Sequence, residues 1–374
     1  MLKYESNYLC PSKLRLINNK RPKCVKMAYL SAKKAIDASK LMGYYVNILA
    51  LIPLFFREDT TIMKCLIIDA VHEAIAQELG KHMQVDHKML PTQAELVTLI
   101  PDYDVLIMRV DPAINKEILE AAKNLKVIGV CSVGLNHIDM EAAKAKGIQV
   151  FNAPGLNANA VAELTISKML DLARNTMTAN HDVKILKQWD KYKFVGRELR
   201  GRTLGVVGFG RIGRRVAELG RAFGMTTVAY DPFLKPEDFQ KENTTGLAVE
   251  ELLKVSDFIS IHVPLTPETR DLVSKKQIDF MKNDAVVLNM SRGGIVNEKD
   301  AYEALKNGQL GGFGSDVLEN ELADGGLTEG AGFDSPLFEL DNFIVSPHIG
   351  AQSVDASRDI GAHIVAKVKE TLSL

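Results

Sequence analysis

The chain has 374 residues, which is long enough for two domains that each bury a hydrophobic core. With 46% hydrophobic and 25% charged residues, its composition is that of a globular protein and excludes a disordered or fibrous one. A formal net charge of -1 argues against general attraction to nucleic acid or to anionic lipid.

Residues 1–62 differ from the rest of the chain. They carry 11 Lys/Arg against four Asp/Glu, and their apolar run over 41–56 is short for a membrane span and is interrupted by Asn47 and Pro53. An organellar targeting peptide is also basic and poor in acids, so that alternative stays open. We expect an N-terminal extension outside the core fold, with the natural start at Met63.

The cysteine pattern indicates a reducing compartment, and the motifs indicate that no metal is bound. Cys10, Cys24, Cys65 and Cys131 form no CxxC pair, so we expect reduced thiols and a cytoplasmic location. The sequence holds no HExxH motif and no clustered carboxylates, and we therefore predict no metal.

From Met63 onward, short apolar runs alternate with helical stretches. We predict strands at 65–69, 83–86, 104–110, 126–130 and 148–152, with helices at 72–79, 92–99, 115–123 and 140–146. This alternation predicts a parallel sheet with helices on both faces. The stretch Ala160–Asn175 is expected to be a long helix that connects two domains.

A second alternation starts at 203–210. We predict a helix at 212–223 and further strands at 226–230, 258–263, 285–290, 311–317 and 342–346. A last helix over 354–372 should pack back on the first domain and make that domain discontinuous. The pattern predicts an α/β protein of two Rossmann/flavodoxin-like doubly wound parallel-sheet domains, with the active site in the cleft between them.

A glycine-rich turn is the strongest single motif. Gly208, Gly210 and Gly213 form a GxGxxG pattern that leaves an apolar strand and opens an amphipathic helix. The first glycine permits a tight turn, the second lets backbone approach a pyrophosphate, and the third lets helix and strand pack closely. Asp231 lies 18 residues past Gly213, where a carboxylate would bind the ribose 2′-hydroxyl of NAD and repel the 2′-phosphate of NADP. We predict NAD as the cofactor.

Three polar residues follow predicted strands of the second domain. They are Arg292, Glu321 and His348, and the carboxyl ends of parallel strands meet at one edge of a sheet. Imidazole titrates near neutrality, so His348 suits the proton transfer that accompanies oxidation of a 2-hydroxy acid. Glu321 would orient it and favour its protonated form, and Arg292 can pair with the substrate carboxylate and polarise the C2 oxygen. Taken singly, an arginine or a histidine is more often structural, and it is their joint placement after successive strands that favours the functional interpretation.

Longer motifs give a specific resemblance. The runs LRGRTLGVVGFGRIGRRVAELGRAFGM, HVPLTPETR, LNMSRGGIVNEKDAYEAL and SPHIGAQS occur in the order and spacing of the D-isomer-specific 2-hydroxyacid dehydrogenases. The chain resembles that family over Met63–Leu374. The resemblance implies Arg292, Glu321 and His348 as the catalytic set, a substrate domain at 63–160 plus 347–374, and an NAD-binding domain at 161–346.

The same resemblance implies further site residues. Backbone amides of a loop matching Ser132, Val133 and Gly134 would bind the substrate carboxylate, Asp316 would lie near the nicotinamide amide, and contacts of the long helix would form a homodimer. The cofactor set predicted in this way is Gly208, Gly210, Arg211, Ile212, Gly213, Asp231, Pro264 and Asp316. His262 is expected to line the adenine side.

One departure from the family pattern concerns Glu321. The family usually has Pro after the catalytic Glu, whereas Leu322 stands here and a glycine-rich stretch, 323–335, lengthens the following loop. Glu319 therefore stays open as an alternative carboxylate.

The substrate is predicted from a narrower resemblance. The stretch 131–164 is most similar to D-3-phosphoglycerate dehydrogenases, enzymes of serine biosynthesis, and Arg109 matches a basic residue that such enzymes place near the substrate. An arginine binds phosphate and carboxylate alike, so glyoxylate or hydroxypyruvate reductase and D-lactate dehydrogenase remain open. An NAD-sensing scaffold resembling the corepressors of the family is the non-enzymatic alternative.

Overall fold

The computed structural model describes residues 62–319 and 334–374 of the chain. The predicted extension therefore lies outside the described residues except for Ile62, and so does Glu321. Two parallel sheets with helices on their faces make up the described part, which confirms the predicted fold class.

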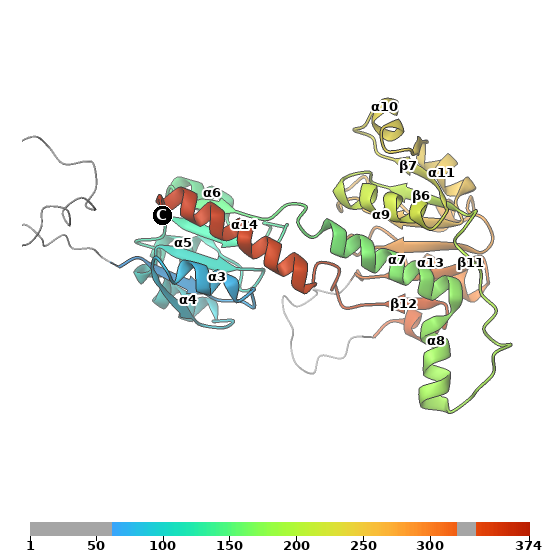
Figure 1. Ribbon diagram of the computed structural model, residues 1–374, viewed down its shortest axis with the longest axis horizontal. Helices are drawn as coiled ribbons and strands as arrows, with labels where there is room; N and C mark the ends of the chain where they lie inside the picture. Colours follow the sequence, from blue (N-terminus) through green and yellow to red (C-terminus); the bar gives the residue numbers. More distant parts are fainter. Residues whose placement is uncertain (1–61, 320–333) are drawn as a thin grey trace, which may run out of the picture. The chain divides into compact units, whose positions relative to one another are not determined.

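The first sheet has five parallel strands in the order β2-β1-β3-β4-β5, the flavodoxin-like arrangement (Figure 1). Its strands are β1 (Lys64–Ile67), β2 (Gln84–His87), β3 (Val105–Met108), β4 (Val127–Val130) and β5 (Gln149–Phe151). Its helices are α3 (Ala74–Leu79), α4 (Gln93–Leu99), α5 (Lys116–Ala121) and α6 (Met140–Ala145), with a short 3₁₀ turn η2 (Ile100–Asp102). β3 and β4 are wholly buried and wholly apolar apart from Gly129, as expected for strands covered on both faces.

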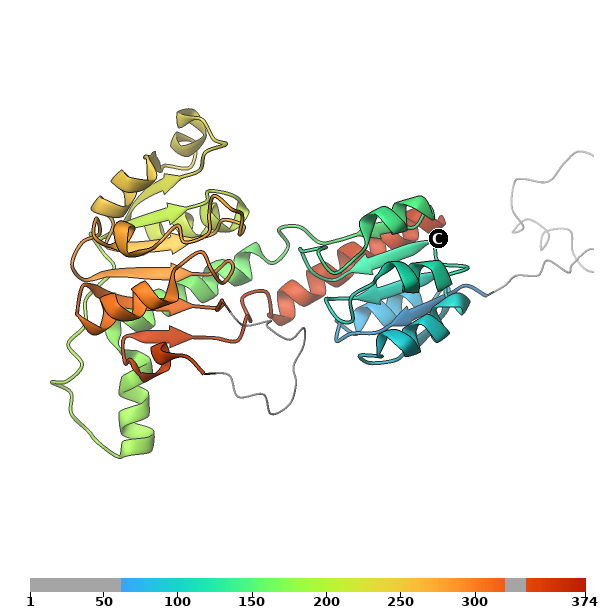
Figure 2. The same cartoon turned by 180° about the vertical axis from the view of Figure 1, so that it is seen from behind.

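The last helix, α14 (Val354–Leu372), covers one face of this first sheet (Figure 2). Ile360 and Ile364 belong to the same buried cluster as Ile67 of β1 and Val127 of β4. The close approach depends on Gly129, because a Cβ at that position would lie 2.5 Å from Cγ2 of Ile364. Chain segments from both ends of the described sequence thus share one core, although the exact domain boundaries stay a prediction.

The second sheet has seven parallel strands in the order β12-β11-β10-β9-β6-β7-β8. The strands are β6 (Thr203–Val207), β7 (Thr226–Tyr230), β8 (Thr245–Gly246), β9 (Phe258–Ile261), β10 (Ala285–Asn289), β11 (Leu310–Ser315) and β12 (Phe343–Val345). From β6 the strands are added on one side as β7 and β8, and the next strand, β9, then pairs with the other side of β6. Ligands of doubly wound sheets bind where the strand order reverses in this way.

Helices cover both faces of the second sheet. They are α7 (Ala158–Arg174), α9 (Arg211–Ala222), α10 (Pro236–Gln240), α11 (Val249–Val255), α12 (Lys275–Ile278) and α13 (Glu298–Lys306), with a 3₁₀ turn η4 (Pro336–Glu339). Helix α7 lies on β10 and β11, where Leu172 fits against Gly312 and Gly314. The long helix predicted at Ala160–Asn175 is therefore present, shifted by two residues at its start.

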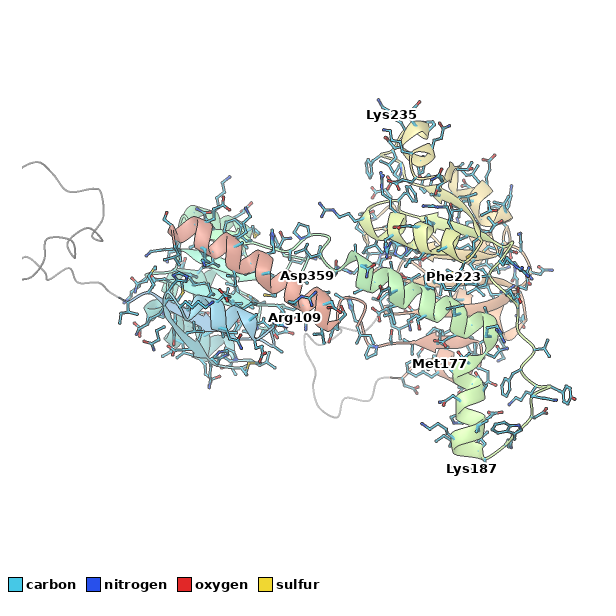
Figure 3. The ribbon with its side chains drawn as sticks, viewed as in Figure 1. Arg109, Met177, Lys187, Phe223, Lys235 and Asp359 are labelled. Carbon is cyan, nitrogen blue, oxygen red and sulfur yellow. The ribbon has the colours of Figure 1, made fainter. Side chains whose placement is uncertain are left out.

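A segment after α7 carries exposed apolar side chains. It consists of α8 (Thr176–His181), the π-helical turn η3 (Asp182–Leu186) and the strand-free stretch that leads to β6, and it lies at the end of α7 that Figure 3 marks with Met177 and Lys187. Trp189, Tyr192 and Val195 are 86%, 78% and 80% exposed. Sequence reasoning did not predict these helices. None of the described helices is long and apolar enough to cross a membrane.

Candidate active site

The glycine turn between β6 and α9 has the geometry that dinucleotide binding requires. Gly208 has φ +90°, a left-handed backbone, and a Cβ there would lie 2.7 Å from the carbonyl oxygen of His262. At Gly213 a Cβ would lie 2.1 Å from the carbonyl oxygen of Gly208, so helix and turn can pack closely only at glycine. Gly210 in contrast faces open space, because a Cβ at this position would have no atom within 4 Å. The residues present therefore fit a pyrophosphate at the N-terminus of α9.

Asp231 follows β7 directly and is tied to this turn. Its Oδ2 accepts a hydrogen bond of 3.0 Å from the N–H of Phe209, and its Oδ1 accepts one of 3.0 Å from the N–H of Phe233. The side chain is partly exposed, so lone pairs remain for a ligand hydroxyl. A carboxylate held at this place fits the ribose of NAD, and Lys235, four residues further on, is exposed.

The other predicted cofactor residues surround the glycine turn. Arg211 is exposed at the start of α9, and its Nη1 donates a hydrogen bond of 2.6 Å to the carbonyl of Pro154. Ile212 is partly buried and packs on the core beneath α9. Pro264, three residues past β9, accepts a hydrogen bond of 2.6 Å through its carbonyl from Thr269 Oγ1.

The loop that carries His348 is held by Asp316. The Asp316 carboxylate, buried just past β11, accepts hydrogen bonds from Ser346 Oγ (2.5 Å), Ile349 N–H (3.0 Å) and Gly350 N–H (2.7 Å). Its own carbonyl accepts the N–H of His348 at 2.9 Å. The His348 side chain itself is exposed, and its backbone φ is +51°. One buried carboxylate thus fixes the residues on both sides of this histidine.

A buried ammonium lies beside that carboxylate. Lys168 of α7 is only 5% exposed, and burial lowers its pKa while the charges of Asp316 and Asp171 oppose the shift. No hydrogen bond to Lys168 Nζ is recorded among the described residues. Sequence reasoning missed Lys168, because its place on the apolar side of an amphipathic helix is the only signal it gives.

Arg292 lies beyond β10 on a turn that β10 itself stabilises. Asn289 Nδ2 donates to the carbonyl of Arg292 at 2.9 Å, and Ser291 Oγ donates to the carbonyl of Ile261 at 2.9 Å. The guanidinium is exposed, with one N–H on the carbonyl of Ser291 at 2.7 Å. Its remaining donors are available to an anion. Since β10, β11 and β12 are neighbours in a parallel sheet, Arg292, Asp316 and His348 all follow strands at the same edge as the glycine turn.

The carboxylate partner of His348 lies outside the described residues. Glu321 falls in the undescribed stretch 320–333, so its position stays a prediction. Glu319 is described, and its carboxylate lies 3.5 Å from Arg270 Nη1 while its N–H donates to Glu298 at 2.6 Å. Glu319 thus forms an exposed ion pair with Arg270, and the choice between Glu319 and Glu321 stays a prediction.

In the first sheet, Arg109 follows β3 (Figure 3). Asp69, just past β1, fixes this turn because its Oδ2 accepts the N–H groups of Arg109 (3.1 Å) and Val110 (3.0 Å). Sequence reasoning missed Asp69. An acidic residue directly after the first strand was the available signal.

The loop after β4 holds the predicted carboxylate-binding amides. Val133 is 41% exposed, and a Cβ on Gly134 would meet no atom within 4 Å. The side chain of Asn152, beyond β5, donates to the carbonyl of Val133 at 2.7 Å. Arg109 and this loop follow β3 and β4, which pair side by side, so they share one edge of the first sheet.

Two histidines have covered ring nitrogens. His262 donates or accepts one hydrogen bond of 2.7 Å between Nε2 and Ser260 Oγ, while its Nδ1 is covered and has no partner among the described residues. Burial lowers the pKa of His262 to about 3, so this ring is neutral at physiological pH. Burial also lowers the pKa of His137, whose Nε2 likewise has no partner in the described part of the chain. The neutral ring of His262 therefore does not fit a proton carrier.

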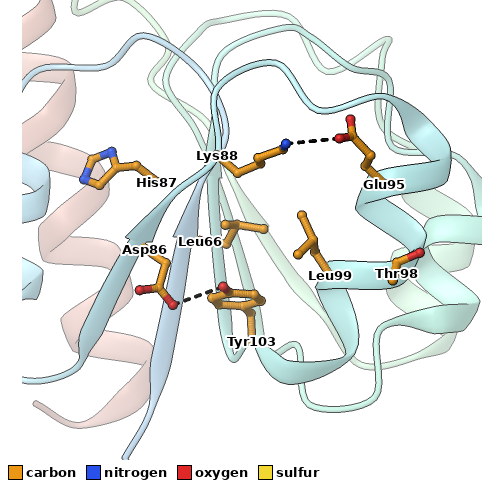
Figure 4. Close-up of a pocket in the computed structure, with 8 residues that line it drawn as sticks. All are labelled: Leu66, Asp86, His87, Lys88, Glu95, Thr98, Leu99 and Tyr103. Carbon is orange, nitrogen blue, oxygen red and sulfur yellow. Dashed lines mark hydrogen bonds and ion pairs between the residues drawn. The ribbon is translucent and has the colours of Figure 1, made fainter.

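A separate hollow of about 410 Å³ lies beside the edge strand β2 (Figure 4). Four of its polar side chains are paired with each other, since Lys88 Nζ lies 3.0 Å from Glu95 and Tyr103 donates to Asp86 at 3.0 Å. None of the predicted site residues lines it. No group of three metal-binding side chains occurs within 62–319 and 334–374.

A glycine turn at a strand-order reversal, an aspartate after the next strand and polar residues at the same sheet edge define a dinucleotide-binding α/β protein. Comparison with known sequences agrees. A profile described as "D-isomer specific 2-hydroxyacid dehydrogenase, NAD binding domain" matches residues 166–350. The chain belongs to the D-isomer specific 2-hydroxyacid dehydrogenase family, and its cofactor is NAD.

Individual relatives differ in their named substrates. The chain is 40% identical over 83% of its length to a D-3-phosphoglycerate dehydrogenase of Methanocaldococcus jannaschii, of which it spans 57%. It is 41% identical over 75% of its length to a hydroxypyruvate reductase of Thermotoga maritima, covering 88% of that protein. The crystal structure of an Aquifex aeolicus D-lactate dehydrogenase with NAD and lactic acid matches with a TM-score of 0.70 and 33% identity, over 83% of this chain and 97% of that one.

Proposed function

We propose that this protein is an NAD-dependent dehydrogenase of D-2-hydroxy acids, with D-3-phosphoglycerate and 3-phosphohydroxypyruvate as its substrate pair. The observation that supports it most directly is the Asp316 carboxylate, which holds the loop of His348 at the sheet edge that also carries the glycine turn. A proton-transferring side chain must be held within about 3 Å of its target, so a fixed loop is the expected design.

The residues divide the chemistry between them. NAD, held at the glycine turn and Asp231, would supply the acceptor for the hydride that leaves C2 of the hydroxy acid. His348 takes the hydroxyl proton in that direction and returns it in the reverse direction, with Glu321 favouring the protonated imidazole. Arg292 pairs with the substrate carboxylate and the C2 oxygen through its planar fork of donors. The N–H groups of Val133 and Gly134 bind the same carboxylate.

The phosphorylated substrate is supported by two observations. Arg109 supplies a guanidinium at the substrate-sheet edge, on a turn that Asp69 fixes, and guanidinium binds a phosphate in a bidentate manner. Several relatives, including that of Methanocaldococcus jannaschii, are named D-3-phosphoglycerate dehydrogenases. We place the activity in serine biosynthesis on the same basis, and in the cytoplasm because the cysteines form no CxxC pair and Cys65 and Cys131 are free thiols.

The relatives named hydroxypyruvate reductase and D-lactate dehydrogenase favour a second candidate, an enzyme for small unphosphorylated 2-oxo acids. Steady-state kinetics with NADH on phosphohydroxypyruvate, hydroxypyruvate, glyoxylate and pyruvate separate the two. We expect the highest kcat/KM on phosphohydroxypyruvate. If the enzyme did not reduce phosphohydroxypyruvate but turned over glyoxylate or pyruvate rapidly, the phosphorylated substrate would be rejected. Absence of turnover on all four, with intact NADH binding, would favour the scaffold alternative.

We further propose a homodimer. Trp189, Tyr192 and Val195, three large apolar side chains within seven residues after α7, are exposed, and an exposed apolar patch marks an interaction site. A second copy of the chain would cover them. Light scattering on the purified protein should give twice the monomer mass, and Trp189→Glu should shift it toward the monomer.

A further inference from the structure

Consecutive carbonyl groups of the loop after β4 are all engaged by the protein. Those of Ser132, Val133, Gly134 and Leu135 each accept a hydrogen bond. The donors, in the same order, are Ala153 N–H at 3.1 Å, Asn152 Nδ2 at 2.7 Å, Ser132 Oγ at 3.2 Å and Ile138 N–H at 3.0 Å. The loop is thus held on its carbonyl side.

The amide side of the same peptides is open. In a trans peptide the N–H of the following residue points away from the carbonyl, so a bond on one side fixes the direction of the other. The N–H groups of Val133 and Gly134 donate to no described residue, and Gly134 faces open space. Successive backbone N–H groups of a turn can form an anion-binding concavity. A carbonyl that accepts a hydrogen bond also polarises its peptide and makes the N–H a better donor.

The donors are not equivalent. Ala153 and Ile138 use backbone N–H groups, which every residue except proline supplies. Ser132 has one hydroxyl proton, and its Oγ lies 3.1 Å from the carbonyl of Arg109 and 3.2 Å from that of Gly134, so the proton is shared. Asn152 alone gives a side-chain N–H to a single carbonyl of this loop. That carbonyl belongs to the Val133–Gly134 peptide, whose N–H is one of the two that donate to no described residue.

We propose that Asn152 is a positioning residue for substrate binding. By holding the carbonyl of Val133, it aims the N–H of Gly134 at the carboxylate of the 2-oxo or 2-hydroxy acid. This inference rests on the proposed function, in which the loop binds that carboxylate.

Asn152→Asp is the direct test, because the substitution keeps the shape of the side chain and removes its donor. An ionised carboxylate would also repel the Val133 carbonyl and turn the peptide. Asn124→Asp is the matched control, since Asn124 Nδ2 donates to the carbonyl of Pro101 at 3.0 Å before β4, at the opposite end of that strand from Val133. Asn152→Ala removes the donor without adding charge and serves if the aspartate variant does not fold.

The readouts are KM and kcat for the best 2-oxo acid, and the Kd of oxamate for the enzyme–NADH complex by calorimetry. For Asn152→Asp we expect KM and the oxamate Kd to rise by about ten- to a hundredfold, the loss of one charge-assisted hydrogen bond, with NADH affinity unchanged and kcat changed less. Asn124→Asp should match the wild type.

Unchanged KM and oxamate affinity in Asn152→Asp, or a fall in kcat alone, would overturn the inference while leaving the proposed function intact. A wild-type enzyme that reduces no 2-oxo acid would instead reject the proposed function, and this inference with it.

Discussion

The carboxylate of Asp316 accepts a hydrogen bond of 2.7 Å from the N–H of Gly350, two residues beyond His348. Gly350 has no room for a side chain there, because a Cβ would lie 2.8 Å from the same carboxylate oxygen. The aspartate and the glycine therefore fit as a pair. The family resemblance suggested that Asp316 lies near the nicotinamide amide, and the structure gives it a second task, which is to hold the histidine loop.

Asp316→Asn should weaken this loop, because an amide offers one acceptor oxygen where the carboxylate offers two and would turn N–H groups toward backbone donors. We expect the free energy of unfolding to fall by about 2 kcal/mol, and kcat to fall more than NADH affinity. Chemical denaturation and stopped-flow kinetics measure both. Asp341→Asn, an exposed aspartate before β12, is the control. A variant with normal kcat would show that His348 needs no such support.

His348→Asn tests proton transfer with little disturbance of the backbone. Asparagine tolerates the left-handed φ of +51° at this position better than most residues, and it does not titrate. We expect kcat to fall by about 10²–10⁴-fold, the usual contribution of general acid–base catalysis, with the Kd of NADH nearly unchanged. Equal losses of turnover and of cofactor binding would contradict the proposed role.

Asp231→Ala should erode the preference for NAD over NADP. The alanine loses the acceptor for the ribose hydroxyl and removes the charge that repels a 2′-phosphate, so we expect the ratio of kcat/KM values for the two cofactors to fall by about tenfold or more. Because Asp231 also accepts the N–H groups of Phe209 and Phe233, some loss of stability should accompany the change. Asp238→Ala, on the nearby helix α10, is the control. An unchanged ratio would mean that another group selects the cofactor.

Much of this arrangement could be predicted from the sequence because it depends on regular patterns. The amphipathic period predicted α14 at Val354–Leu372, and runs rich in apolar residues identified β3 and β10. Motif glycines and residues just past strand ends located the candidate site. Segments that bury little apolar surface, such as α8 and the exposed stretch around Trp189, have no such period and were missed.

The supporting residues were less predictable for a different reason. Asp69 contacts Arg109, which is 40 residues away in the chain, and Asn152 contacts Val133, 19 residues away. Lys168 interacts with the charge of Asp316, well over 100 residues away. Single-sequence patterns carry only local spacing, and these pairings exist only once the strands are in order. Glu321 remains a prediction from the motif alone.

His262 should make the fold sensitive to mild acid. Its folded-state pKa, lowered by burial from 6.5 to about 3, lies below that of the unfolded chain, so the unfolded state takes up a proton first as the pH falls. The free energy of unfolding should therefore decrease by up to about 1.4 kcal/mol per pH unit from about pH 6.5 downward, and the loss should level off near pH 3. Above pH 6.5 this contribution is constant.

Carboxylates also titrate below pH 5, so the measurement compares variants between pH 7.5 and 5. His262→Gln keeps a polar atom for Ser260 Oγ and cannot be protonated, and it should lose less stability than the wild type as the pH falls. His82→Gln, at an exposed position, should follow the wild-type profile. A constant difference in the free energy of unfolding between the wild type and His262→Gln over this range would contradict the prediction. It would mean that the His262 ring accepts a proton as readily in the folded protein as in the unfolded chain, so that the covered Nδ1 does not cause acid sensitivity.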